Sequence, residues 1–297
     1  MPYALAIGDR SYSSWSLRGW LLFDAFGIPV DVHLAHMRTP AFPALLSGFG
    51  AARTVPALRF EHGVVWDSLS ILQTLAERHP DAGYWPEDPA QRALARNMVA
   101  EMHSGFAELR GNCPMVLHHR MDGFVPSEGV RADLARLSQL WGLAREASAG
   151  PWLFGDYSAA DAFFAPVAAR IAAYDLPMPP EDQAYVATHL AQGSFRRWRA
   201  LGQTDPHIQH QYDNDFKKLA WPGPIPLPAE ALSDGAAVNP ACPFSGKPTE
   251  TNALARIDGV IYGFCNPGCR DKVVQDAEAW PEVSAMIHET RQALSTN

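Results

Sequence analysis

Apolar positions in the first 80 residues change their spacing from segment to segment, which predicts strands and helices in turn. The predicted strands cover 3–7, 30–34, 57–60 and 64–66, and the predicted helices cover 15–26 and 68–78. Gly27 ends the first helix as a C-cap, and Pro80 follows the second. This order of elements predicts a small α/β domain over residues 1–82.

Helical spacing dominates residues 86–220 and predicts an all-α helical bundle. Its first helix is expected to be long, over 88–119, with bends at Gly111 and Pro114. A further helix is expected to begin at Ser158-Ala-Ala-Asp161, because a serine followed three residues later by an acidic side chain fits a capping box.

Prolines interrupt the helical pattern after this bundle. The sequence WPGPIPL at 221–227 cannot hold a helix, and it predicts an extended linker over 221–238. The remaining residues, 239–297, are strand-like from 253 to 264 and then helical from Cys269 onward. They predict a small C-terminal α+β domain with a thin core of its own.

Composition and charge narrow the class of protein. The chain is 47% hydrophobic and 19% charged, as in soluble globular proteins, and its formal net charge is -8. An acidic balance argues against a nucleic-acid partner, since such affinity comes mostly from basic surfaces. No apolar run approaches the roughly 20 residues that cross a bilayer. Asp9 and Arg10 interrupt any secretory leader, so we expect no membrane partner and a cytoplasmic location.

Hydroxyl side chains gather before the first predicted helix, in Ser11-Tyr-Ser-Ser-Trp-Ser-Leu-Arg18. A helix N-terminus favours negative charge, and a hydroxyl there can donate a hydrogen bond to a bound thiolate. Lowering a thiol pKa of about 8.5 by one or two units needs only about 1.4–2.7 kcal/mol. Helix capping alone is the alternative interpretation of these serines.

Two further segments could hold an extended ligand. Thr54, Val55 and Pro56 precede a strand, and a cis Val55–Pro56 bond would expose the backbone N–H and C=O of Val55 to a peptide. Ser68 at a helix N-terminus could hold a carboxylate, and Asp67 could accept from an ammonium group. A strand-edge device and an ordinary N-cap are the alternatives.

Together these segments resemble the glutathione S-transferase family over residues 1 to about 220. The resemblance implies a thioredoxin-like first domain, an all-helical second domain, glutathione as co-substrate and a homodimer. The hydroxyl-rich segment is similar to the zeta-type Ser-Ser-Cys-x-x-Arg motif, which places Ser13 at the catalytic serine, with Ser14 or Tyr12 in reserve. Trp15 stands where that class has cysteine, which counts against maleylacetoacetate isomerisation.

The resemblance also implies where the ligands bind. The electrophile is expected between the first domain and the long helix, where His103, Phe106 and Arg110 share one face; a packed helix pair would show the same spacing. The substrate-binding candidates are Thr54, Val55, Pro56, Asp67 and Ser68 for glutathione, and His103, Ser104, Phe106 and Arg110 for the electrophile.

Three of the four cysteines lie in the last 56 residues, at Cys242, Cys265 and Cys269. A tight Asn-Pro-Gly turn separates the last two, so all three sulfurs can converge on one metal ion, preferably zinc or Cu(I). Three reduced thiols, or a redox pair at the last two, are the alternatives.

The spacing of 22 and then 3 residues resembles the YHS/TRASH family of metal-binding domains and implies a treble-clef-like zinc site. His288, Asp271 or water would supply the fourth ligand.

The leading functional interpretation is a glutathione transferase, in which a Ser hydroxyl activates the glutathione thiol. The thiol would attack a small electrophile or serve glutathione-dependent isomerisation or peroxide reduction. The alternative is a non-catalytic binding protein on the same scaffold, with a metal-sensing or metal-buffering C-terminal domain.

Overall fold

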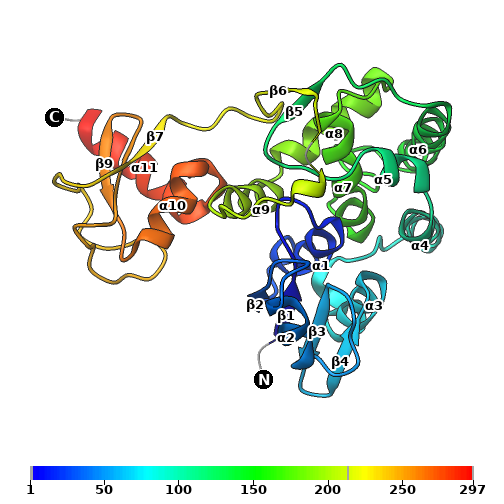
Figure 1. Ribbon diagram of the computed structural model, residues 1–297, viewed down its shortest axis with the longest axis horizontal. Helices are drawn as coiled ribbons and strands as arrows, with labels where there is room; N and C mark the ends of the chain where they lie inside the picture. The colour runs from blue at the N-terminus through cyan, green and yellow to red at the C-terminus, as the bar shows by residue number, and fades with distance from the viewer. Residues whose placement is uncertain (1–2, 213, 296–297) are drawn as a thin grey trace. The chain divides into compact units, whose positions relative to one another are not determined.

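The computed structural model describes residues 3–212 and 214–295 (Figure 1). The chain forms two compact units, and each is discontinuous in sequence. Unit 1 comprises Met1–Gln192 and His207–Gly223, and unit 2 comprises Gly193–Pro206 and Pro224–Asn297.

Unit 1 begins with a four-stranded sheet in the order β2-β1-β3-β4 (Figure 1). The strands are β1 (Tyr3–Ile7), β2 (Val30–Leu34), β3 (Ala57–Phe60) and β4 (Gly63–Trp66). β1 pairs with β2 in parallel and with β3 in antiparallel, and β4 pairs antiparallel with β3. All four predicted strands are confirmed.

Three helices cover this sheet: α1 (Ser14–Asp24), α2 (Ala41–Ser47) and α3 (Ser68–Arg78). Ala4 and Ala6 pack with Leu46 of α2 in one hydrophobic cluster. Leu5 and Ile7 alternate with them and point to the opposite face, where α1 and α3 pack together. Helices on both faces of a mixed sheet make this the predicted thioredoxin-like α/β domain.

The rest of unit 1 is mainly helical. Its helices are α4 (Pro89–Ser104), α5 (Ala107–Asn112), α6 (Glu128–Ala147), α7 (Ala159–Ala173) and α8 (Pro180–Ala191), with short 3-10 turns at η1 (Pro80–Ala82) and η2 (His210–Tyr212). Strands β5 (Arg120–Asp122) and β6 (Lys217–Leu219) form a small antiparallel pair. Within the described part of the chain, no helix combines the length and apolarity that crossing a membrane requires.

The expected long helix over 88–119 is wrong in its length and its breaking point. α4 ends at Ser104, and Phe106 takes a left-handed conformation with φ 60° before α5 begins. A Cβ on Gly105 would lie 2.8 Å from the Glu101 carbonyl oxygen, so the residue that permits this break is glycine. The capping box at α7 is confirmed, since Ser158 and Asp161 bond to each other's backbone N–H.

Unit 2 contains a three-stranded antiparallel sheet in the order β7-β8-β9. Its elements are α9 (Gly193–Gln203), β7 (Ala229–Leu232), β8 (Leu254–Ile257), β9 (Val260–Gly263), α10 (Pro267–Gln275), η3 (Ala277–Ala279) and α11 (Pro281–Ser295). β7 falls inside the segment 221–238 that we expected to be an extended linker, so part of that segment belongs to a folded sheet.

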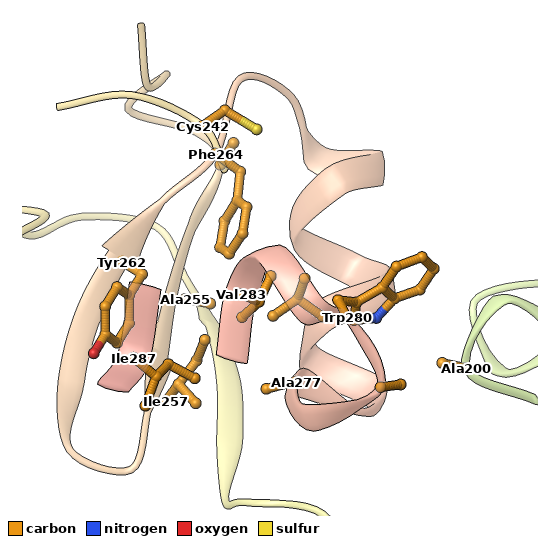
Figure 2. Close-up of a cluster of buried hydrophobic side chains, with 13 residues drawn as sticks. Ala200, Cys242, Ala255, Ile257, Tyr262, Phe264, Ala277, Trp280, Val283 and Ile287 are labelled. Atoms are coloured by element: carbon orange, nitrogen blue, oxygen red, sulfur yellow. The ribbon is translucent and has the colours of Figure 1, made fainter. Parts of the chain in front are cut away.

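A contiguous hydrophobic core holds unit 2 together (Figure 2). Phe264, Val283 and Ile287 lie between the strands and the helices, and Trp280 lies on the side of Ala200 from α9. The expectation of a thin core was wrong because α9, which we had assigned to the helical bundle of residues 86–220, contributes to this cluster. Arg196 of α9 adds a bidentate ion pair with Asp276, at 2.7 and 2.8 Å.

Candidate active site and cysteine cluster

A cavity of about 460 Å³ lies beside the N-terminus of α1 in unit 1. It brings together four of the residues predicted from the sequence, namely Tyr12, Ser13, Ser14 and Arg110. Its wall also contains Trp15, Met37, Arg170 and Tyr212. Hydroxyl groups and guanidinium groups therefore face the same space.

Ser13 is the N-cap of α1. Its hydroxyl oxygen accepts a hydrogen bond from the Ser16 backbone N–H at 3.2 Å, and its hydroxyl donates to Ser16 Oγ at 2.8 Å. The Ser13 backbone N–H in turn donates to the Asp9 carbonyl at 2.8 Å. Both the lone pair and the proton of this hydroxyl thus serve the helix N-terminus.

Ser14 has a different environment, although it is also only 7% exposed. Its hydroxyl oxygen accepts a hydrogen bond from Nη2 of Arg170 at 3.3 Å. Among residues 3–212 and 214–295, no acceptor takes the Ser14 proton. A hydroxyl oxygen that accepts a hydrogen bond from a cation becomes a stronger hydrogen-bond donor, and here its proton is available to a ligand.

Tyr12 forms part of the cavity wall. Its ring stacks on Tyr212 with centroids 5.6 Å apart, and it contacts the His118 ring at the same separation. The side chain is 8% exposed. Packing of this kind makes Tyr12 a wall that shapes the cavity.

Two arginines lie against Trp15, and a third bonds the neighbouring Ser14. The guanidinium carbons of Arg18 and Arg110 lie 4.6 and 4.7 Å from the Trp15 ring centroid, and Arg170 reaches Ser14. Arg18 is fully buried, and none of the described residues accepts a hydrogen bond from its three guanidinium nitrogens. Burial, followed by repulsion from Arg170 and Arg110, lowers the pKa of Arg18. This part of unit 1 therefore carries an excess of buried positive charge.

Asp67 and His103 do not line the cavity, although the His103 ring contacts Trp15 with centroids 5.2 Å apart. Asp67 caps α3 by accepting from the Leu69 N–H at 2.8 Å, and its second oxygen lies 3.3 Å from His103 Nε2. The pKa of His103 is lowered, mainly by burial and further by Arg18 and Arg110, although Asp67 opposes this. His103 is therefore neutral more readily than a free histidine.

Ser68, Val55 and Pro56 are buried in the same domain, away from the lining of the cavity. Ser68 is fully buried, and its hydroxyl finds no partner in the part of the chain that the structure describes. The Val55–Pro56 bond is cis. The structure thus brings Ser13, Ser14 and Arg110 to one cavity. The glutathione-binding candidates Val55, Pro56 and Ser68 belong to the same domain but do not line that cavity.

The remaining candidates take other positions. Thr54 and Ser104 are exposed, and Ser104 bonds back to the Ala100 carbonyl at 3.0 Å. Phe106 is 6% exposed and occupies the left-handed turn between α4 and α5. Cys113, the one cysteine of unit 1 and not a predicted site residue, is fully buried, and burial raises the pKa of its thiol to about 12, which makes it a structural thiol.

The three cysteines of unit 2 converge as predicted. All three sulfurs lie within 4.8 Å of one another, and the Sγ atoms of Cys265 and Cys269 are 3.9 Å apart. Asn266 caps α10 by accepting from the Cys269 N–H at 2.9 Å, which places that sulfur at a helix N-terminus. Ser245 Oγ donates to the Cys265 sulfur at 3.2 Å.

Cys242 is the buried member of this group, at 1% exposed. Burial alone would raise the pKa of its thiol, but the backbone N–H groups of Cys265 and Phe244 point at the sulfur and lower the pKa to about 7. His288 and Asp271 do not join the sulfurs among the described donor groups, since the first contacts Gln292 and the second pairs with Arg270.

Sequence patterns did not predict that Arg170 and Tyr212 line the cavity, nor that Arg18 packs against Trp15. Arg170 lies on α7 and Tyr212 on η2, far along the chain from Ser14, so only the tertiary fold brings them to the cavity. Arg18 belongs to the hydroxyl-rich segment, and its place four residues after Ser14 on a helix was a usable signal.

Comparison with known proteins identifies the type of fold. A family model described as the glutathione S-transferase N-terminal domain matches residues 12–78. A stretch of 100 residues is 29% identical to a probable maleylacetoacetate isomerase of Caenorhabditis elegans, covering 34% of this chain and 46% of that protein. The chain thus spans less than half the length of this curated relative.

Solved structures extend the similarity beyond the first domain. A glutathione transferase homologue from Burkholderia with bound glutathione is 22% identical, with a TM-score of 0.53, over 69% of this chain and 100% of that chain. The maleylacetoacetate isomerase of Anaeromyxobacter dehalogenans is 22% identical, with a TM-score of 0.50, over 70% of this chain and 98% of that chain. It has been solved with glutathione, and with dicarboxyethyl glutathione and citrate, in its active site.

At these identities the likeness is one of fold. A thioredoxin-like α/β domain is followed by helices in the order that these enzymes share. The chain therefore has the fold of glutathione transferases, and residues 12–78 match the N-terminal domain of that family.

Proposed function

We propose that unit 1 is a glutathione-dependent enzyme in which the Ser14 hydroxyl stabilises the glutathione thiolate at the N-terminus of α1. One observation carries this proposal: Ser14 lies in a cavity, accepts from the Arg170 cation, and keeps its own proton for a ligand. Ser13, our first choice from the sequence, acts as the helix cap that fixes this turn. Tyr12 shapes the wall.

The glutathione peptide lies beside this serine in the proposal, along the residues predicted from the sequence. Val55 pairs with the peptide backbone, Ser68 bonds the ligand carboxylate, and Asp67 accepts from its ammonium group. The buried, unpartnered Ser68 hydroxyl supports this assignment, because such a group is costly unless a ligand bonds it.

The second substrate is a small electrophile that carries a carboxylate. Arg110 and Arg170 line the cavity, Arg18 lies against Trp15, and Asp67 is the carboxylate that offsets them. Guanidinium groups on a cavity wall favour an anionic ligand, and the buried charge of Arg18 adds to the local positive potential. The polycarboxylates bound by the Anaeromyxobacter isomerase support this charge preference.

The reaction is attack of the glutathione thiolate on this electrophile, or a reversible attack that isomerises it. In either case the negative charge starts on sulfur and moves to the electrophile, close to Arg110 and Arg170. Fixed positive charges at that point stabilise the transition state. Trp15 replaces the cysteine of the zeta-type motif, so we do not assign maleylacetoacetate as the substrate.

A matched pair of electrophiles tests the proposal. A chlorodinitrobenzoate and the chlorodinitrobenzene that lacks its carboxylate share one reactive carbon. Arg110→Ala is expected to lower kcat/KM for the benzoate about 10–100-fold more than for the benzene, since a hydrogen bond to a charged group contributes about 1.5–3 kcal/mol. Arg136→Ala, which removes an exposed pair with Glu101, is the control. Equal losses refute the charge preference, and absence of glutathione binding and turnover refutes the enzyme.

A second candidate function rests on the cysteine cluster of unit 2. In it, Cys242, Cys265 and Cys269 bind one zinc ion in a treble-clef-like site, and the chain is a non-catalytic glutathione-fold protein that senses or buffers metal. Three soft donors within 4.8 Å of one another support zinc binding. Tight zinc binding without turnover of any electrophile favours this candidate; turnover favours the enzyme, with zinc as a structural element.

A homodimer in the cytoplasm completes the proposal. A groove of about 550 Å³ runs along α3 and α4, lined by apolar side chains such as Leu69 and Trp85 and by charged ones such as Glu77 and Arg96, and a second copy would cover it. The cytoplasm keeps glutathione and cysteine thiols reduced, which suits four free cysteines. A strictly monomeric mass by light scattering at micromolar concentration refutes the dimer.

A further inference from the structure

A cluster of two histidines and one aspartate lies at one end of the unit 1 sheet, outside the residues assigned so far. Asp9 follows β1, His36 follows β2, and His207 begins the second segment of the unit. Asp9 is 2% exposed, and the two histidine side chains are 30% and 32% exposed. A buried carboxylate is thus reached from the surface through two imidazoles.

The donor atoms converge on one oxygen. His36 Nδ1 lies 2.8 Å and His207 Nε2 lies 3.7 Å from Asp9 Oδ1, and the imidazole rings stack with centroids 4.0 Å apart. All three donor atoms lie within 4.8 Å of one another. Two ligands of a tetrahedral zinc ion, with bonds of about 2.0–2.2 Å, are about 3.4 Å apart, so a small movement accommodates an ion.

The other oxygen of Asp9 is held in place by the protein. Oδ2 accepts from the Met37 backbone N–H at 2.9 Å and from Gln209 Nε2 at 3.1 Å. Gln209 is 4% exposed and also donates to the Met37 carbonyl at 3.0 Å. Carboxylates that bind metal are commonly oriented in this way by a second layer of hydrogen bonds.

We propose that Asp9 Oδ1, His36 Nδ1 and His207 Nε2 bind a divalent first-row metal ion, with zinc as the reference ion and water at the remaining position. Two imidazoles and one carboxylate favour such an ion over magnesium or calcium. The ion would take the place of the hydrogen bond between His36 Nδ1 and Asp9 Oδ1, since a ring nitrogen binds a metal only through its free lone pair. Gln209 Nε2, now 3.2 Å from His207 Nε2, gives up that contact.

The ion acts as a structural tie beside the cavity. The Asp9 carbonyl accepts from the backbone N–H groups of Tyr12 and Ser13, at 3.2 and 2.8 Å, so Asp9 also fixes the turn before α1. His207 and Gln209 lead into η2, whose Tyr212 stacks on Tyr12. A metal ion would therefore hold this segment against the ends of β1 and β2, next to the turn that leads into Ser13 and Ser14 at the start of α1.

This site differs from the cysteine cluster in unit and in donor type, and zinc loading of the full-length protein can separate the two. His36→Gln and His207→Gln are each expected to lose one zinc ion per chain, measured by elemental analysis after desalting. His33→Gln is the matched control, because His33 on β2 pairs with Asp31 at 3.0 Å outside the cluster. Cysteine titration verifies that the sulfur cluster is unchanged.

Gln209→Ala tests the orienting hydrogen bond. It is expected to weaken zinc binding at this site about 10–100-fold, while circular dichroism reports an unchanged fold. Zinc content equal to the wild type in His36→Gln and in His207→Gln would overturn the proposal and leave the cluster as a hydrogen-bonded network. A loss in these two variants that the His33 control shares would overturn it equally.

Discussion

Replacing Ser14 by alanine is expected to raise the pKa of the glutathione thiol bound in the cavity of unit 1. The Ser14 hydroxyl accepts from Arg170 at 3.3 Å and has its proton available for the sulfur. A hydrogen bond to a charged group contributes about 1.5–3 kcal/mol, and one pKa unit corresponds to 1.36 kcal/mol, so the shift is about 1–2 units. The residue is 7% exposed, so solvent screens little of this effect.

The assay is the ultraviolet absorbance of bound thiolate, followed against pH for the wild type and for variants saturated with glutathione. Ser13→Ala provides the matched control, because its hydroxyl caps α1. Loss of that cap is expected to cost about 1 kcal/mol of unfolding free energy and to leave the thiol pKa close to the wild-type value.

The reasoning fails if Ser14→Ala titrates like the wild type. It also fails if the roles are reversed, with a raised thiol pKa in Ser13→Ala alone, since the catalytic hydroxyl would then be the one that also caps the helix.

Three further predictions concern the Arg196–Asp276 ion pair and two of the cysteines. Asp276→Ala is expected to destabilise unit 2 by about 3 kcal/mol in urea unfolding, because it removes the bidentate partner of the Arg196 guanidinium and leaves it only the Glu278 carboxylate, at 3.5 Å; a loss below about 1 kcal/mol would contradict this. Burial raises the pKa of Cys113 to about 12, so its thiol stays neutral at pH 8. Peptide mapping at pH 8 should find Cys113 unlabelled by a thiol reagent until the chain unfolds, and rapid labelling of the native protein would argue against its burial. Cys269→Ser should release zinc, measured by elemental analysis, without changing glutathione turnover; unchanged zinc content would exclude the cysteine cluster as its site.

Local patterns were enough to predict the sheet and its helices. β1 to β4 follow short apolar runs, and the capping box at Ser158 and Asp161 forms as expected. The break after α4 was misplaced because Phe106 adopts a left-handed conformation that its own chemistry does not favour, and tertiary packing fixes it. Gly105 was visible in the sequence, but a glycine inside a helical pattern is a weak signal.

Site residues, too, could be predicted where they lie close together in sequence and not where only the tertiary fold brings them together. Ser13, Ser14 and the three cysteines were found because each set lies within a short motif or a fixed spacing. Arg170 could not be found, since its distance from Ser14 along the chain carries no local signal. Asp9 and His36 could have been paired, because they follow neighbouring parallel strands whose ends meet at one edge.

Each of the two units is built from two separate segments of the chain, which restricts where the protein can be cut into fragments that fold. α9 precedes the last segment of unit 1 in sequence, yet its Ala200 and Arg196 belong to the core and ion pair of unit 2. A fragment cut at the proline-rich segment would keep α9 and lose α10 and η3, which pack against it, so the exposed apolar face of α9 should make the fragment aggregate. To express unit 2 alone, residues 193–206 must instead be joined directly to residues 224–297, and residues 207–223, which belong to unit 1, must be left out.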